Sequence, residues 1–265
     1  MLIKLIACEI AVREFCYVTA RSKNIVDPEF LTQGYHDTPN SGRQEVQKRI
    51  NAVPKGKYDA IVLGYGLCSS ILSGLYTPHT KMVIPRAHDC ITFFLGSKER
   101  YQQCFDANPG TYYYTCGWLE CTRRRASQGQ EGPAMLFPAQ GGISAAYEHW
   151  VKKYGEEKAK YLLEVMGEWT AGYTHGTLID YEFTKPLALR DQVSRICRER
   201  GWQFSELEGD LGLFQRLVDG DWRDSEVLVL EPGQRIAQVF DGGIIAAEPR
   251  PEPDAGNGND VSDSK

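Results

Sequence analysis

The fold is decided by residues 58–68, which read Tyr-Asp-Ala-Ile-Val-Leu-Gly-Tyr-Gly-Leu-Cys. The run 58–64 is short, largely apolar and ends in glycine, which is typical of a strand covered on both faces in a parallel sheet. Gly64 and Gly66 allow the backbone to turn tightly and to approach a ligand closely. The stretch therefore predicts a buried strand that brings Cys68 to its carboxyl end.

The same order of strand and helix is found on both sides of this stretch. Residues 2–7 and 81–85 are further short apolar runs, and apolar spacing predicts helices over 41–53 and 91–107. Strands that alternate with helices through short connections are typical of βαβ units with right-handed crossovers. We therefore predict an α/β fold, with a mostly parallel sheet flanked by helices in three layers.

The rest of the chain continues the alternation. Pro and Gly predict a loop over 27–40, and a long loop, a lid or a passage to a second half, is predicted over 127–142. Further strands are predicted at 111–115, 177–181, 203–207 and 226–230, and further helices at 143–154, 156–169, 187–200 and 210–218. We predict a single α/β domain over 1–248 and, from its polar composition, a disordered tail over 249–265.

Composition and charge narrow the class of protein. The 265 residues include 30 Lys and Arg against 35 Asp and Glu, a net charge of −5, which argues against nucleic acid or an anionic membrane as a partner. The apolar start turns polar at Glu9 and Arg13, unlike a signal peptide or a membrane span. Eight cysteines without an export signal are expected to be reduced, metal-bound or catalytic. We expect a cytoplasmic protein.

Three cysteines follow three predicted parallel strands. Cys8 comes directly after the first, Cys68 after the second and Cys90 after the third. The carboxyl ends of parallel strands share one edge, where open α/β sheets bind ligands, and the helices that begin there favour thiolates. We predict that these cysteines hold zinc or a [4Fe-4S] cluster with one open position, although ordinary packing is the alternative for each of them.

The neighbouring residues complete this hypothesis. An extended His-x-Cys segment places His88 on the same face as Cys90, as a fourth ligand or a general acid/base, and Arg86 is predicted to orient an anionic group. The alternative is a backbone-bonded His88 and a surface ion pair for Arg86. Gly64 and Gly66 are predicted to contact the cofactor, but the rest of a dinucleotide fingerprint and any Walker loop are missing.

The other five cysteines are weaker candidates. Cys116 and Cys121 follow the strand predicted at 111–115, where they extend the site, form a redox pair or simply pack. Cys16, Cys104 and Cys197 fall on predicted helices, and we expect them to pack.

Five segments of the chain resemble one family. They are Asp-Ala-Ile-Val-Leu-Gly-Tyr-Gly-Leu-Cys at 59–68, Ile-Pro-Arg-Ala-His-Asp-Cys at 84–90, Leu-Gly-Ser-Lys-Glu-Arg-Tyr at 95–101, Asn-Pro-Gly-Thr-Tyr-Tyr at 108–113, and Ser-Glu-Val-Leu-Val-Leu-Glu-Pro-Gly-Gln-Arg-Ile at 225–236. Together they resemble the domain-of-unknown-function 1638 family of bacterial and archaeal proteins over about residues 1–245. The resemblance implies a compact domain with Cys8, Cys68, His88 and Cys90 as motif positions. Some members occur in organisms with corrinoid-dependent methyl transfer, which implies a corrinoid or methyltransferase partner protein.

Three hypotheses for the function remain open. The first is a metalloenzyme of the transferase or lyase class that activates a small-molecule substrate, for instance by thiol or methyl-group transfer. The second is a metal-free enzyme with Cys90 as its nucleophile and His88 beside it. The third is a non-catalytic accessory module that binds a metal or a corrinoid.

Overall fold

The central sheet has five strands in the order β2-β1-β3-β4-β8. The computed structural model describes residues 1–68, 70–127, 151–152, 155–160 and 172–251. The strands of this sheet are β1 (Leu2–Cys8), β2 (Ile25–Leu31), β3 (Ala60–Gly64), β4 (Met82–Pro85) and β8 (Val227–Leu230). The first four run parallel, and β8 lies antiparallel to β4. The predicted α/β class with a mostly parallel sheet is confirmed.

The two strands that decided the prediction are buried along their whole length. Every residue of β3 and of β4 is buried, as expected for central parallel strands covered on both faces. Glycine is needed at the end of β3, because a Cβ at Gly64 would lie 2.5 Å from the Cβ of Ala7 and 2.6 Å from the ring of Phe15. The end of β3 is therefore packed directly against β1 and the helix that follows it.

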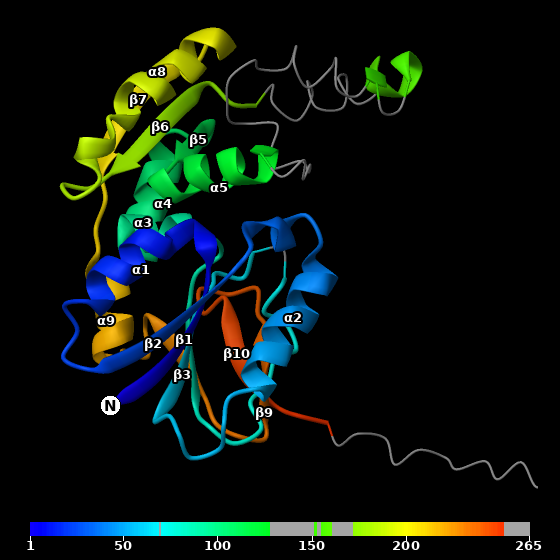
Figure 1. Cartoon of the computed structure of the whole chain (residues 1–265), viewed down its shortest axis with the longest axis vertical. Coiled ribbons are helices and arrows are strands. Elements are labelled where there is room, and N and C mark those ends of the chain that lie inside the picture. The colour runs from blue at the N-terminus through cyan, green and yellow to red at the C-terminus, as the bar shows by residue number, and fades with distance from the viewer. Residues whose placement is uncertain (69, 128–150, 153–154, 161–171, 252–265) are drawn as a thin grey trace, which may run out of the picture.

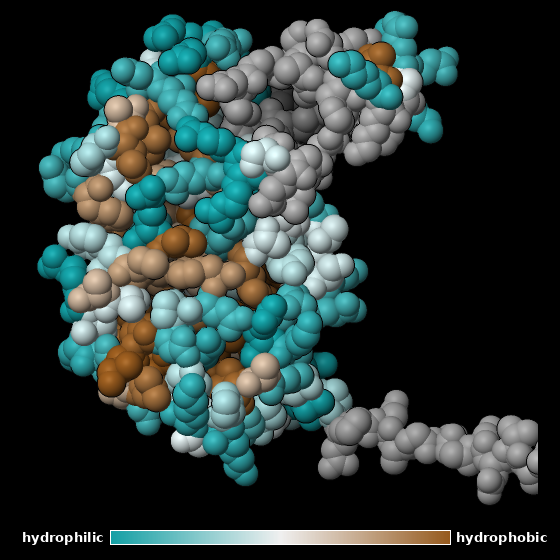
Figure 2. All heavy atoms as spheres, viewed as in Figure 1, coloured by the Kyte–Doolittle hydropathy of each residue, from teal (hydrophilic) through white to brown (hydrophobic). Residues whose placement is uncertain are grey.

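Helices cover both faces of this sheet. The helices α1 (Val12–Thr19) and α9 (Gly212–Asp219) contact each other on one side, and α2 (Pro39–Asn51) lies on the other (Figure 1). On α2, Val46 and Ile50 are buried, whereas hydrophilic side chains cover its outer side (Figure 2). The predicted helix over 91–107 is two helices, α3 (Ile91–Leu95) and α4 (Lys98–Ala107), because Gly96 has a φ of 84° and ends α3.

A second sheet was not foreseen. The strands β5 (Thr111–Tyr114), β6 (His175–Asp180) and β7 (Gln203–Glu208) form a separate parallel sheet in the order β5-β6-β7. With α8 (Leu189–Arg200) it encloses its own hydrophobic cluster, which includes Tyr114 and Val193. This unit lies above the central sheet in Figure 1, next to α5 (Cys116–Ser127). These strands were predicted, but alternation along the chain does not say which strands pair.

The prediction of a loop over 27–40 is wrong. Its first part belongs to β2, and a 3-10 helix, η2 (Gln33–His36), follows. Pro28 lies opposite Leu5 of β1 and is tolerated because β2 is an edge strand, where an N–H can be missing. The charged residues of this strand pair across to β1, since Lys4 lies 3.2 Å from Glu29.

The last described segment is an antiparallel hairpin that the sequence did not predict. Its strands are β9 (Gln234–Gln238) and β10 (Ile245–Pro249), so the first residue of the predicted tail is in a strand. The rest of that tail, the predicted loop over 127–142 and the helices over 143–154 and 156–169 lie largely outside the described residues. Among the described helices, none has both the length and the apolar character needed to cross a membrane.

Candidate functional site

The carboxyl ends of the four parallel strands meet at one small buried cavity. Cys8, the last residue of β1, lines it with Cys68 and Cys90, which follow β3 and β4, and with His36 and Tyr65. The centre of a water-sized sphere can occupy only about 10 Å³ of it, which is room for about one water molecule. We call it the thiol cavity. The three cysteines that the sequence placed at one edge of the sheet therefore share one cavity there.

The loops that carry Cys68 and Cys90 are fastened to each other beyond the strands. The N–H of Leu67 donates to the carbonyl of Ala87 at 2.8 Å, and that of Cys68 donates to His88 at 3.0 Å. A Cβ at Gly66 would lie 2.8 Å from the main chain of Asp89, so only glycine allows this approach. Cys68 itself has a φ of 39°, an unfavourable left-handed conformation that these bonds hold in place.

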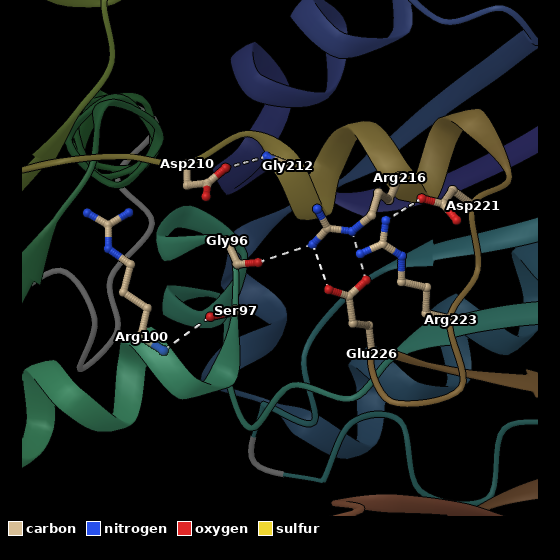
Figure 3. A network of polar contacts seen from close by, with 9 residues as sticks. All are labelled: Gly96, Ser97, Arg100, Asp210, Gly212, Arg216, Asp221, Arg223 and Glu226. Carbon is tan, nitrogen blue, oxygen red and sulfur yellow. Dashed lines mark hydrogen bonds and ion pairs between the residues drawn. The ribbon is translucent and has the colours of Figure 1, made fainter.

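The backbone of Cys90 is fixed through the helix that begins after it. Asp89 accepts hydrogen bonds from the N–H of Ile91 and the hydroxyl of Tyr101, both at 2.9 Å. At the far end of α3, Arg216 donates to the carbonyl of Gly96 at 3.5 Å and forms an ion pair of 2.7 Å with Glu226 (Figure 3). The segment from Cys90 to Gly96 is thus tied to α9 and to the residue before β8.

The three thiols are protonated at neutral pH. Burial raises the pKa of Cys8 to about 12, and it raises the pKa values of Cys68 and Cys90 well above their ordinary value. Asp89 and the neighbouring thiols raise the pKa of Cys68 and of Cys90 further. Among the described residues, the lining of the cavity contains neither Lys nor Arg. The expected stabilisation of thiolates by helix N-termini is outweighed by burial.

His36 is a cavity residue that the sequence analysis missed. It lies at the end of η2, just after β2, and therefore at the same edge of the sheet as the cysteines. Burial lowers its pKa, so the imidazole is neutral at pH 7, and within the described residues its ring nitrogens have no hydrogen-bond partner. Recognising β2 as a strand would have placed His36 at this site.

Tyr65 brings the other polar group of the cavity. Its side chain is only 3% exposed, and within the described part of the chain its hydroxyl has no hydrogen-bond partner. Burial and the nearby sulfurs of Cys8 and Cys68 raise its pKa, so the hydroxyl keeps its proton. Nothing in the sequence pointed to this position, because Tyr65 stands there only between Gly64 and Gly66, which also line the cavity.

The structure does not bring His88 and Arg86 to the cavity. The side chain of His88 is exposed and does not line the cavity, although its carbonyl accepts the hydrogen bond from Cys68. The guanidinium of Arg86 donates instead to four main-chain oxygens, those of Asp224, Val227, Gly243 and Ile245. Arg86 thereby joins the end of β4 to β8 and to the start of β10.

The remaining cysteines lie outside the cavity lining. Cys116 and Cys121 are buried in α5, whose Gly117 rests on the backbone of η1 (Glu9–Ala11). Cys197 is buried and Cys104 is half-buried, but the prediction that Cys16 packs is wrong, because it is exposed. All eight cysteines are free thiols.

The types of side chain that line the cavity and the positions of these side chains lead to different conclusions about a metal site. Thiolates and a neutral imidazole are ligands that zinc and iron–sulfur clusters accept. Within the described part of the chain, however, no three His, Cys, Asp or Glu side chains are grouped so as to hold a metal ion. The residues fit a metal by their chemistry and not by their present side-chain positions.

These features define an α/β protein with a thiol-lined cavity at the carboxyl ends of its parallel strands. Residues 30–218 match the family described as "Protein of unknown function (DUF1638)", and the chain belongs to this family. The resemblance predicted from the motifs is thus confirmed. The searches of curated proteins and of solved structures give no match to the chain.

Proposed function

We propose that this protein binds a metal cofactor, zinc or a [4Fe-4S] cluster, through Cys8, Cys68 and Cys90 and uses it to activate a small substrate. One observation carries the proposal: three cysteines from three loops line the same buried cavity. Single cysteines are often buried as ordinary packing residues. Three thiols around one cavity, one of them on a strained backbone, are not explained by packing alone.

The electrostatics of the cavity are consistent with a cation as its occupant. Each buried thiol makes it harder to ionise its neighbours, so the cavity as it stands disfavours thiolates. A bound metal reverses this, because coordinating thiols lose their protons. A cysteine side chain has a single torsion to its sulfur, so the proposal requires that rotation about this bond brings the three sulfurs together.

The proposed chemistry follows from an open coordination position. Zinc with a free position lowers the pKa of a substrate thiol, and a cluster with a free iron acts as a Lewis acid. This suits a transferase of thiol or methyl groups, or a lyase, with a corrinoid or methyltransferase protein as partner. We assign to His36, rather than to His88, the role of fourth ligand or general acid/base, because His36 lines the cavity.

The free thiols also indicate the cellular compartment in which the protein acts. We infer that the protein works in the reducing cytoplasm, since eight free thiols suit that compartment.

Cys90 as a metal-free nucleophile is less well supported, because burial keeps its thiol protonated and among the described residues no cation lines the cavity.

The test is metal analysis with a visible absorption spectrum on protein purified without oxygen. The wild type should contain stoichiometric zinc or show an iron–sulfur chromophore. Cys8→Ser, Cys68→Ser and Cys90→Ser should each lose it, while Cys104→Ser, a half-buried cysteine on α4, should keep it. Circular dichroism checks that each variant is folded.

The outcomes separate the three functions. A metal-free, colourless wild type refutes the metal proposal. Metal that is lost in all three variants, in a protein that turns over none of the small thiols or methyl donors offered to it, favours the accessory module over the enzyme.

A further inference from the structure

A groove that is open to solvent is formed by residues of α1 and α5 together with Phe183, and we call it the arginine groove. Its volume is about 850 Å³, which is within the range of binding sites for small molecules. In the part of the chain that the structure describes, its lining shares no residue with that of the thiol cavity. The arginine groove is therefore a separate feature, and what it binds does not depend on a metal.

The lining of the arginine groove has an excess of positive charge. It contains Arg13, Arg123 and Arg124 but, among the described residues, only one carboxylate, that of Glu120. Arg13 donates to Glu120 from Nε at 3.0 Å and from Nη2 at 2.6 Å, so these two charges compensate each other. Arg124 donates to Glu9, which lies outside the lining, at 2.6 Å. This excess occurs on a chain whose net charge is −5.

Arg123 has the charge that no partner compensates. Its side chain is exposed, and among the described residues no hydrogen bond or ion pair involves its guanidinium. It stands in a run of three arginines, of which Arg125 is only 5% exposed and donates to Gln33 and Asp37 at 2.7 and 2.6 Å. Arg124 and Arg125 thus hold α5 in place, whereas Arg123 leaves its five N–H donors for a ligand.

The part of the groove away from α5 is aromatic. Tyr17 and Phe183 stack there with ring centroids 4.5 Å apart and planes at 13°. The adjoining hollow, which shares these two rings, is lined by three carboxylates and one cation: Glu182, Glu208, Asp210 and Arg100. An anion is therefore attracted to the α5 side of the rings and repelled from the other side.

We propose that the arginine groove binds a small organic anion, with its carboxylate or phosphate on Arg123 and its apolar body against Tyr17 and Phe183. The planar guanidinium matches the oxygens of both anions in two-pronged geometry. Because the groove is open, the ion pair alone is weak and is screened by salt, so the apolar contacts supply the rest of the affinity. This site is independent of the proposed metal site.

Cys16 provides a reporter inside the groove. It lines the groove and is exposed, while the other seven cysteines are buried or half-buried, so the neutral reagent iodoacetamide reaches it first. The test measures, by mass spectrometry of the Cys16 peptide, how far phenyl phosphate and benzoate slow this alkylation. We expect both to protect Cys16. Inorganic phosphate and benzyl alcohol, which have only the charge or only the ring, should protect it far less.

Substitutions of exposed residues check which side chain holds the anion. Arg123→Gln should bind phenyl phosphate about 3-fold more weakly, and Glu120→Gln, which releases Arg13, about 3-fold more tightly. Arg195→Gln removes an exposed arginine of α8 and is the matched control, which should bind like the wild type. High salt should weaken binding to the wild type and remove its advantage over Arg123→Gln.

Three results would overturn the proposal. Equal protection by phenyl phosphate and benzyl alcohol means that the groove takes the ring without the charge. Equal affinity of Arg123→Gln, Glu120→Gln and the wild type means that the anion binds elsewhere. Absence of protection by every probe means that the groove is not a site for organic anions. Stronger protection by phenyl phosphate than by benzoate, or the reverse, identifies the anionic group, and protein with and without bound metal should give the same result.

Discussion

A buried carboxyl group in α1 predicts an unusual dependence of stability on pH. The side chain of Glu14 is fully buried, and neither of its oxygens has a hydrogen-bond partner among the residues that the structure describes. Burial raises its pKa from 4.5 to about 8. Because charge on this group is disfavoured in the folded protein, Glu14 is protonated there at neutral pH and ionised in the unfolded chain.

This difference in pKa sets the direction and the size of the effect of pH on the free energy of unfolding. Below pH 4.5 Glu14 is protonated in both the folded and the unfolded protein, so its ionisation does not change the free energy of unfolding. Between pH 4.5 and about 8 Glu14 loses its proton only in the unfolded chain, so the free energy of unfolding falls as pH rises. Each pH unit in this interval removes about 1.4 kcal/mol, which amounts to about 3 kcal/mol at pH 7. Above about pH 8 both states are ionised and the loss levels off.

Glu14→Gln removes the ionisation and keeps the shape of the side chain. We expect the variant to be more stable than the wild type by about 3 kcal/mol at pH 7 and to match it near pH 4.5. The assay is urea unfolding followed by circular dichroism at several pH values between 4.5 and 8.5. Glu99→Gln, at an exposed position of α4, is the matched control and should follow the wild type throughout.

The reasoning is refuted if the difference between Glu14→Gln and the wild type is the same at every pH. Such a result means that Glu14 ionises in the folded protein as easily as in the unfolded chain. An unfolding midpoint that moves equally in Glu99→Gln would place the pH dependence elsewhere.

Three further predictions concern the cavity and its supports. His36→Ala should weaken metal binding or change the metal spectrum, while His88→Ala should do neither, as metal titrations of the two variants will show. Gly64→Ala should destabilise the protein by about 1–3 kcal/mol through overpacking, whereas Gly242→Ala, where a Cβ meets nothing, should not; urea unfolding compares them. Arg86→Ala should lower the thermal midpoint, because four carbonyls lose a donor, yet leave the metal content unchanged.

The sequence was sufficient wherever a strand is covered on both faces. The apolar runs at 58–64 and 81–85 are typical of strands covered on both faces, and they contain the wholly buried strands β3 and β4. Once the strands are known, the parallel arrangement itself brings Cys8, Cys68 and Cys90 to one edge. That part of the site was accessible because it depends on chain order alone.

The sequence was insufficient where a residue's role depends on a partner far along the chain. Pro and Gly favoured a loop over 27–40, and the contact between Lys4 and Glu29 is not visible along the chain, so β2 and the His36 that follows it were missed. Arg86 looked like a substrate ligand because its four partners lie about 140 or more residues away in the sequence. Strand pairing into two sheets is set by the same kind of distant contact.

Three features of the thiol cavity, whose Cys8, Tyr65 and Cys68 belong to the hydrophobic core, differ from ordinary core packing. A core gains stability from apolar packing, relaxed backbone and paired polar groups. Here the chain keeps a left-handed Cys68, a hydroxyl on Tyr65 with no partner among the described residues, and three thiols that oppose each other's ionisation. The proposed metal would relieve the last of these, because coordinating thiols lose their protons. The three thiols are therefore the unfavourable feature that the proposed function explains.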